Sequence, residues 1–530
     1  MYAVSGLVVL YLVIKFLPVP GVPCEISAAK ECAPSNDTIA YVPRDALLYA
    51  HLTVNSDSHQ WELARDLRDE LPNFTALLQS DTSALAGPAG RPLDLSREVL
   101  PWVKDDLAVL GVPGPTNSTP ETYIAGVGDS GKANQFAASL SPGGKAKQVK
   151  VGPVTLSVYS NGVATARSGD ELLFGNVVAV RAALAAKAGQ VPELDGSALD
   201  QARDELPAVR LAEIYLSRAG IQRLLVGRGN SATQLDTFVD YGATSGMAAG
   251  ARVRDDGVQV NVVSELDPKL EPQSPTVFAS LPQFTPGLAD EAGPNALGYV
   301  GFGDLGPAIT KALATAGASA QGLAGSLRGL SQRLKQEAGV DPLKDLLPAL
   351  GGQAALVAEP TGGAPYASLI VDGVDEKKAG DALAAFQGPL LRALNTGGPQ
   401  VPSFQTREVD GVTVHSVQAS PNIDLSYAIF DGKLVISTQP AGISQVRSSG
   451  DNLTGTSAFK DATDRLPDRV SALVFLNLDE LLKLAQLAGL AENPLYGSLS
   501  EDISHVSSLG LAVRGSADEL RSELFLAIHH

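Results

Sequence analysis

The chain has 530 residues, 44% of them hydrophobic and 18% charged, so it can bury large cores, and its length predicts roughly two to four domains. Its formal net charge of −18 would repel a phosphate backbone, and aromatic residues make up only 5%. Composition therefore argues against nucleic-acid binding and against a ligand surface built on stacked rings.

The first predicted element is a membrane segment. The run Tyr2–Leu17 is apolar except for Ser5 and Lys15, and prolines follow it directly. It spans roughly 24 Å as a helix, which is enough to cross a bilayer if Lys15 reaches the interface. A cleaved signal peptide and a buried helix of a soluble domain are the alternatives, but the nearest small-residue cleavage site, Ser27–Ala29, lies far downstream. We expect residues 1–18 to be a retained single-pass anchor.

The only two cysteines, Cys24 and Cys32, lie in the linker that we assign to residues 19–38. Two close cysteines with none elsewhere predict a local disulfide in an oxidising compartment, and hence a chain that lies mainly outside the cytoplasm. A lipoprotein site at Cys24 is the rival hypothesis, although Pro23 stands where a small residue is expected. A metal site would need two further ligands, and none is nearby.

An internal repeat dominates the rest of the chain. Residues 197–207 recur as residues 457–467 with six identities in eleven positions, and each copy leads into an apolar strand, Leu211–Leu216 or Ala472–Leu476. Further collinear matches join 122–127 to 367–371, 151–155 to 409–413, and 250–254 to 510–514. The sequence therefore predicts two copies of one module, at residues 39–267 and 268–530.

Turn signals indicate how each copy folds. Asp255-Asp256-Gly257 and Asp431-Gly432-Lys433 separate pairs of alternating strands, as in β-hairpins. Frequent hairpins imply mostly antiparallel sheets with helices on one face. The predicted fold is α+β: two tandem copies of an antiparallel sheet-plus-helix module after one N-terminal transmembrane helix. Ala- and Leu-rich stretches such as Leu305–Ala338 are expected to be helices that pack on a core or line a lipid-binding groove.

The segment Gly126–Ala133 resembles a phosphate-binding loop, because it follows a strand, precedes a helix and contains Gly, four residues, Gly and Lys. It has Ala133 where a Ser or Thr would hold magnesium. The matching segment of the second copy, residues 371–378, lacks the glycines. We therefore predict a simple strand-to-helix turn and no nucleotide.

A second motif, Ser457-Ala458-Phe459-Lys460, matches the Ser-x-x-Lys of penicillin-recognising enzymes. No Lys-Thr-Gly follows, and the first copy has Asp200 in place of the lysine. We expect Ser197 and Ser457 to cap helices and Lys460 to face solvent.

Histidines and acidic pairs suggest no metal site. His51 and His59 are eight positions apart, and no zinc-ligand spacing occurs. The pairs Asp105-Asp106 and Asp255-Asp256 are expected in solvated turns. The sequence thus predicts no catalytic, cofactor-binding or metal-binding residues.

The opening Tyr41-Val42-Pro43-Arg44-Asp45-Ala46, the short anchor and the strand–helix blocks with a Leu-Pro step resemble a known family. It consists of bacterial, often actinobacterial, envelope proteins described as domain of unknown function 3352. The resemblance implies an envelope location and transfers no catalytic residue.

We therefore expect a membrane-anchored extracytoplasmic protein with a non-catalytic binding or scaffold role. Its partners would be the membrane, through the N-terminal helix, and another envelope protein or an apolar ligand. Two alternatives stay open. A carrier of lipid would need a pocket lined by apolar side chains. A hydrolase would need a cleft that joins a Ser or Asp to a His.

Overall fold

The computed structural model describes residues 36–55, 58–71, 93–140, 145–191, 202–224, 243–267, 269, 281–304, 306, 332, 335–336, 346–361, 365–394, 403–420, 423–448, 450–487, 502 and 504–529. The predicted anchor, together with Cys24 and Cys32, lies outside these residues, so both stay predictions. None of the helices in the described ranges is long and apolar enough to span a membrane. The chain divides into two compact units, unit 1 with residues 1–228 and 245–265, and unit 2 with residues 229–244 and 266–530.

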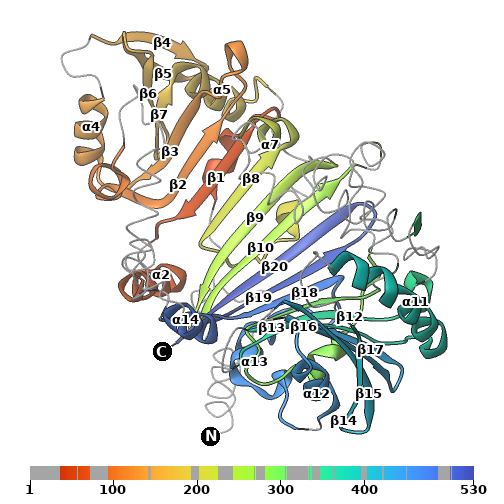
Figure 1. The fold of residues 1–530 in the computed structure, drawn as a ribbon. Helices are drawn as coiled ribbons and strands as arrows, with labels where there is room; N and C mark the ends of the chain where they lie inside the picture. Colours follow the sequence, from red (N-terminus) through yellow and green to blue (C-terminus); the bar gives the residue numbers. More distant parts are fainter. Residues whose placement is uncertain are drawn as a thin grey trace, which may run out of the picture. The chain divides into compact units, whose positions relative to one another are not determined.

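Unit 1 is an antiparallel sheet with helices packed against it (Figure 1). Its strands in chain order are β1 (Leu48–Thr53), β2 (Val103–Gly111), β3 (Glu121–Val127), β4 (Lys147–Val151), β5 (Val154–Val158), β6 (Val163–Ser168), β7 (Glu171–Asn176), β8 (Ala212–Ser217), β9 (Thr244–Arg254) and β10 (Gly257–Leu266). Hydrogen-bonded neighbours follow the order β4-β5-β6-β7-β3-β2-β1-β8-β9-β10. Its helical segments are η2 (Asp37–Tyr41), α2 (His59–Glu70), η4 (Leu95–Val99), η5 (Pro115–Asn117), α4 (Ser130–Ser139), α5 (Val177–Lys187) and α7 (Arg218–Leu224).

Unit 2 has the same strand order, with every strand number raised by ten: β14-β15-β16-β17-β13-β12-β11-β18-β19-β20. Its strands are β11 (Gly298–Phe302), β12 (Ala354–Glu359), β13 (Tyr366–Val371), β14 (Gln405–Val409), β15 (Val412–Ser420), β16 (Ile423–Phe430), β17 (Lys433–Ser437), β18 (Ala472–Asn477), β19 (Val506–Gly515) and β20 (Glu519–Ile528). Its helical segments are η8 (Gly287–Glu291), η10 (Leu347–Ala349), α11 (Glu376–Leu394), α12 (Ala441–Arg447), η11 (Leu453–Gly455), α13 (Ser457–Thr463) and α14 (Leu478–Leu487).

Alternating side chains place a core on each face of the unit 1 sheet, because successive strand residues point to opposite sides. Ile124 of β3 joins the core beneath α5, whereas its neighbour Tyr123 joins the core on the other face with Trp102 and Phe136. In unit 2, Tyr299 and Phe475 belong to one core, and α11 contributes residues to a separate core.

The elements expected from sequence are largely present. The structure confirms an α+β fold with antiparallel strands, and both predicted hairpins, β9–β10 and β16–β17, turn at the expected residues. The two Leu-Pro steps lie at matching places, because Leu206 is six residues before the start of β8 and Leu466 is six residues before the start of β18. Most of Leu305–Ala338 lies outside the described residues.

Candidate functional site

The loop that resembles a phosphate-binding motif is a helix cap. Asp129 precedes α4, and its Oδ1 accepts hydrogen bonds from the backbone N–H groups of Gly131 at 2.9 Å and Lys132 at 3.0 Å. These hydrogen bonds, with that from Lys132 first, hold the pKa of Asp129 below its ordinary value. The donors that would surround a phosphate therefore already bind a carboxylate. Asp375 bonds to Lys378 N in the same way before α11.

The Ser-x-x-Lys motif forms no active site. Ser457 and Lys460 are both exposed, and Lys460 Nζ donates to the carbonyl of Gly455 at 3.3 Å. The predicted exposure of Lys460 is confirmed. The predicted cap at Ser457 is wrong, because Thr456 Oγ1 accepts from Phe459 N at 3.3 Å and Ser457 is the first helical residue. Ser197 and Asp200 lie outside the described residues.

The expectation that Asp105-Asp106 forms a solvated turn is also wrong. Both residues lie in β2, where the register shifts between Val103 and Leu107, and Asp106 is only 5% exposed. Asp105 has a φ of 65°, a left-handed conformation that Asp adopts more readily than most residues. Such bulges redirect side chains and occur often beside functional sites. Asp255-Asp256 does form the predicted turn.

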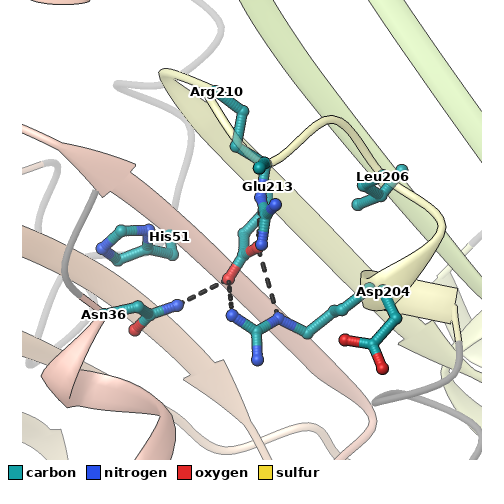
Figure 2. A pocket seen from close by; sticks show the side chains of 8 residues that line it. Asn36, His51, Asp204, Leu206, Arg210 and Glu213 are labelled. Atoms are coloured by element: carbon teal, nitrogen blue, oxygen red, sulfur yellow. Dashed lines mark hydrogen bonds and ion pairs between the residues drawn. The ribbon is translucent and has the colours of Figure 1, made fainter. Parts of the chain in front are cut away.

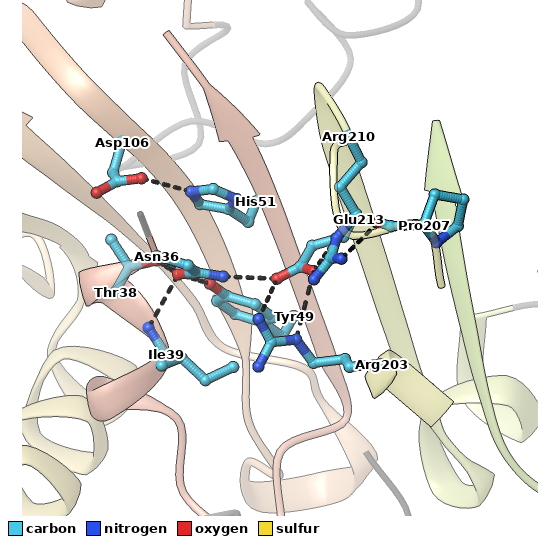
Figure 3. A network of polar contacts seen from close by, with 10 residues as sticks. All are labelled: Asn36, Thr38, Ile39, Tyr49, His51, Asp106, Arg203, Pro207, Arg210 and Glu213. Atoms are coloured by element: carbon cyan, nitrogen blue, oxygen red, sulfur yellow. Dashed lines mark hydrogen bonds and ion pairs between the residues drawn. The ribbon is translucent and has the colours of Figure 1, made fainter. Parts of the chain in front are cut away.

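The bulge in β2 brings Asp106 to His51 of β1. Asp106 Oδ1 lies 2.6 Å from His51 Nε2, and both side chains are buried (Figure 3). Opposite the bulge, a Cβ on Gly126 would lie 2.2 Å from the carbonyl oxygen of Lys104, so only glycine fits there. The sequence showed no histidine cluster, and in the described ranges the structure has no group of three residues that could hold a metal.

Beside this pair lies a cluster of charges around Glu213 of β8, which pairs across the sheet with His51. Glu213 is 4% exposed, and its carboxylate binds the guanidinium groups of Arg203 and Arg210. Arg203 donates from Nε at 3.3 Å and Arg210 from Nε at 2.6 Å (Figure 3). Burial alone would raise the pKa of Glu213, but the two guanidinium groups outweigh it and hold that pKa below its ordinary value.

Asn36 fixes the other side of the cluster. Its Nδ2 donates to Glu213 Oε1 at 2.5 Å, and its Oδ1 accepts from Tyr49 OH at 2.7 Å and Thr38 Oγ1 at 2.9 Å. Burial raises the pKa of Tyr49 above its ordinary value, so the hydroxyl stays protonated and remains a donor. The polar side chains are thus positioned by one another and by the buried strand β1.

A hollow of about 270 Å³ opens over this cluster (Figure 2). Its lining is mainly polar and consists of Asn36, His51, Arg203, Asp204, Leu206, Ala208, Arg210 and Glu213. His51 Nδ1 and Arg203 Nη1 make no hydrogen bond or ion pair with a residue that the structure describes. A second polar hollow, of about 380 Å³, lies on the Asp106 side and is lined by Tyr41, Lys104, Asp170 and Glu171 among others. The first hollow is the candidate site, because two of the residues that line it, His51 and Arg203, each keep a nitrogen without a hydrogen bond to a described residue.

Sequence reasoning considered His51 and Asp106 singly and missed the other members of this cluster. The alternation of β8 could have indicated a buried carboxylate. Glu213 and Tyr215 point to the buried face of the strand, and Ile214 between them is exposed. A carboxylate at an apolar position needs a cationic partner. The cationic partners of Glu213 are Arg203 and Arg210. They lie on either side of the Leu-Pro step and outside the strand, so the strand pattern does not reveal them.

The fold and the site define a two-unit α+β protein with a polar hollow on one sheet. The chain belongs to the family described as "Protein of unknown function (DUF3352)", which matches residues 13–528, so the predicted family is confirmed. No curated protein matches the chain.

Three crystal forms of TP0453 are similar to this chain at low levels. Forms I, III and IV show identities of 9, 10 and 11% and TM-scores of 0.25, 0.24 and 0.25. Each covers 44% of this chain and, in the same order, 79, 80 and 81% of its own. Similarity of this degree supports no inference about function.

Proposed function

We propose that this chain is a membrane-anchored, extracytoplasmic protein of the cell envelope that acts by binding rather than by catalysis. Residues 1–18 would anchor it, Cys24 and Cys32 would form a disulfide in the linker, and residues 39–267 and 268–530 would be two copies of one module. The identical strand order of the two units supports the duplication. The apolar run Tyr2–Leu17 and the close pair of cysteines support the location.

The observation that carries the binding role is the hollow over Glu213. Its polar side chains are held in fixed positions by mutual hydrogen bonds, and the hollow leaves Arg203 Nη1 and His51 Nδ1 unsatisfied. Preorganised donors and acceptors in a small concave site are typical of ligand recognition. Because both described hollows have polar linings, they give no support to the alternative of an apolar-ligand carrier.

The location is tested by adding protease to intact spheroplasts that express the full chain. We expect digestion of everything beyond the anchor and an N-terminus that retains residues 1–18. Complete protection from the protease would refute the extracytoplasmic location. A mature N-terminus beyond residue 20 would refute a retained anchor.

The binding role is tested by purifying the full chain from membranes and extracting small molecules after denaturation. We expect a molecule that is enriched over the Glu213→Leu variant, in which the cluster around the hollow is disrupted. Incubation with fresh protein should leave that molecule chemically unchanged. Conversion to a product would contradict a purely binding role.

A hydrolase is the second candidate, and the contact between His51 Nε2 and Asp106 Oδ1 favours it. An Asp-oriented histidine with its other nitrogen facing a hollow could activate water there. The test measures hydrolysis of p-nitrophenyl esters by the unaltered chain and by His51→Gln. Binding without catalysis predicts equal rates. A rate that disappears with His51 would favour the hydrolase.

A further inference from the structure

We propose that the hollow over Glu213 binds a small hydroxycarboxylate, an organic acid with a hydroxyl next to its carboxylate. Arg203 would bind the carboxylate and His51 the hydroxyl. This inference names the ligand class for the proposed binding function and therefore rests on it.

The charges of the cluster favour an added carboxylate. Two guanidinium groups, those of Arg203 and Arg210, share the single carboxylate of Glu213, so these three groups together carry one net positive charge beside the hollow. The carboxylate of Asp106 hydrogen-bonds to His51 and lines the second hollow instead. A buried charge without a partner is unfavourable, so an anion that enters the hollow is stabilised there. Asp204 also lines the hollow, but it is exposed, so solvent screening leaves only a weak repulsion between its charge and the anion.

Arg203 is the arginine that remains available. Arg210 uses all three of its nitrogens, with Nε and Nη2 on Glu213 and Nη1 on the carbonyl of Pro207 at 2.8 Å. Arg203 uses only Nε and Nη2, at 3.3 and 3.2 Å from Glu213. Its Nη1 keeps two N–H donors, and a charged guanidinium N–H forms a strong hydrogen bond with a carboxylate oxygen.

In its neutral form, His51 supplies an acceptor to the hollow rather than a donor. Asp106, as a carboxylate, can only accept, so the hydrogen in the His51–Asp106 contact is on Nε2. In the neutral ring Nδ1 then carries a lone pair, and a ligand must present a donor to it. A hydroxyl group next to the carboxylate meets this requirement, whereas a plain carboxylate does not.

The size of the hollow limits the ligand. About 270 Å³ is near the lower end of the range of small-molecule pockets, roughly 300–1,000 Å³. Arg203 and His51 both line it, and both adjoin Glu213, one by direct contact and the other as its cross-strand neighbour. Three-carbon acids such as lactate are therefore suitable probes.

The experiment is calorimetric titration of the full chain in detergent with three probes of similar size. We expect lactate to bind, propionate, which lacks the hydroxyl, to bind about tenfold more weakly, and lactamide, which lacks the charge, not to bind. Arg203→Gln should weaken lactate binding about tenfold or more, and His51→Ala should abolish the preference for lactate over propionate.

Two further variants make the test selective. Arg97→Gln removes an arginine of unit 1 whose side chain is 87% exposed and contacts Asp94, and it should leave lactate binding unchanged. Asp204→Asn removes a like charge at the rim and should strengthen binding about two- to fivefold. Thermal unfolding of each variant verifies that it is folded, so Asp204→Asn keeps the test decisive if Arg203→Gln unfolds.

Equal binding of lactate and propionate to the unaltered chain would overturn the proposal, as would lactate binding that Arg203→Gln does not change. Failure of all three probes would also overturn it. Recovery of a different class of molecule from the purified chain would then leave the proposed binding function intact and the hydroxycarboxylate wrong.

Discussion

The two units differ at one row of side chains in the middle of each sheet. In unit 1, His51 of β1 pairs across the sheet with Glu213 of β8, and in unit 2, Gly301 of β11 pairs with Leu473 of β18. Tyr49 is two residues before His51 in β1 and therefore points to the same face of the sheet. It corresponds to Tyr299 in unit 2, and both tyrosines are fully buried. The same strand order is therefore built with a polar pair in one unit and an apolar pair in the other.

This comparison teaches that the architecture does not require charge at this row. Leu473 is as buried in unit 2 as Glu213 is in unit 1, and it needs no arginine to stabilise it. The chain before this row also differs. Asp105 has a left-handed φ inside the bulge of β2 in unit 1, whereas in unit 2 the left-handed residue is Gly352, which precedes β12, and β12 pairs with β13 without a register shift. The polar row is thus a feature of unit 1 that its strand order does not require, which agrees with the binding function proposed above.

The largest expected effect comes from breaking the charge cluster. Glu213→Leu makes unit 1 resemble unit 2 at this row but leaves two arginines without their carboxylate. We expect the free energy of unfolding to fall by about 3–5 kcal/mol. Urea denaturation followed by tryptophan fluorescence reports on unit 1 alone, because the only tryptophans, Trp61 and Trp102, belong to it.

The matched control replaces the whole cluster, with Arg203→Met and Arg210→Met added to Glu213→Leu. Because buried ion triads can be exchanged for apolar residues at little cost, we expect stability within about 1 kcal/mol of the unaltered chain, or above it. A triple variant as unstable as the single one would show that the fold does need this charge.

Lowering the pH should remove the stabilisation that the ionised carboxylate of Glu213 gives to the unaltered chain. Both arginines hold the pKa of Glu213 below its ordinary value of 4.5, after opposing the effect of burial. A carboxyl group with a lowered pKa in the folded state stabilises above its unfolded pKa, and this stabilisation is lost as the pH falls through the folded value. Urea denaturation at pH 7 and below pH 4.5 should therefore show a larger loss for the unaltered chain than for the triple variant. Equal losses would contradict the assignment.

A smaller effect distinguishes the two buried tyrosines. Tyr49 OH bonds to Asn36 and Thr38, whereas Tyr299 OH is buried without a partner among the described residues. Tyr49→Phe leaves polar partners unsatisfied and should cost about 1–3 kcal/mol, while Tyr299→Phe removes an unsatisfied hydroxyl and should cost nothing or stabilise slightly. Calorimetric unfolding of both variants measures the difference. Equal costs would mean that the hydroxyl of Tyr299 has a partner after all.

The sequence predicted the fold better than the site, for a physical reason. Strand alternation, the Asp255-Asp256-Gly257 turn and the Leu-Pro steps are local patterns, so each can be recognised within a few residues. The site is made by contacts such as His51 with Asp106, which are 55 residues apart and meet only through sheet register and a bulge. The only local signal at the bulge is the pair Asp105-Asp106. Paired aspartates indicate a solvated turn, so the sequence predicts an exposed Asp106 rather than a buried one in a bulged strand.

The smallest expected effect concerns places where the units are alike. Asp129 caps α4 in unit 1, and Asp375 bonds to the first turn of α11 in unit 2, each accepting a backbone N–H three residues ahead and lying near that lysine's ammonium group. Replacing a capping Asp by Ala destabilises a helix modestly, because the amide it binds loses its partner.

We therefore expect Asp129→Ala and Asp375→Ala to destabilise by similar amounts, and the double variant to lose about their sum, since distant sites act independently. Thr456→Ala, at the true cap of α13, should cost about as much, and Ser457→Ala much less. Tryptophan fluorescence should detect only Asp129→Ala, while calorimetry should detect all of the cap variants. A large difference in stability loss between Asp129→Ala and Asp375→Ala would show that the two units also diverge away from the polar row. The inference that His51 and Glu213 mark the functional difference would then lose its basis.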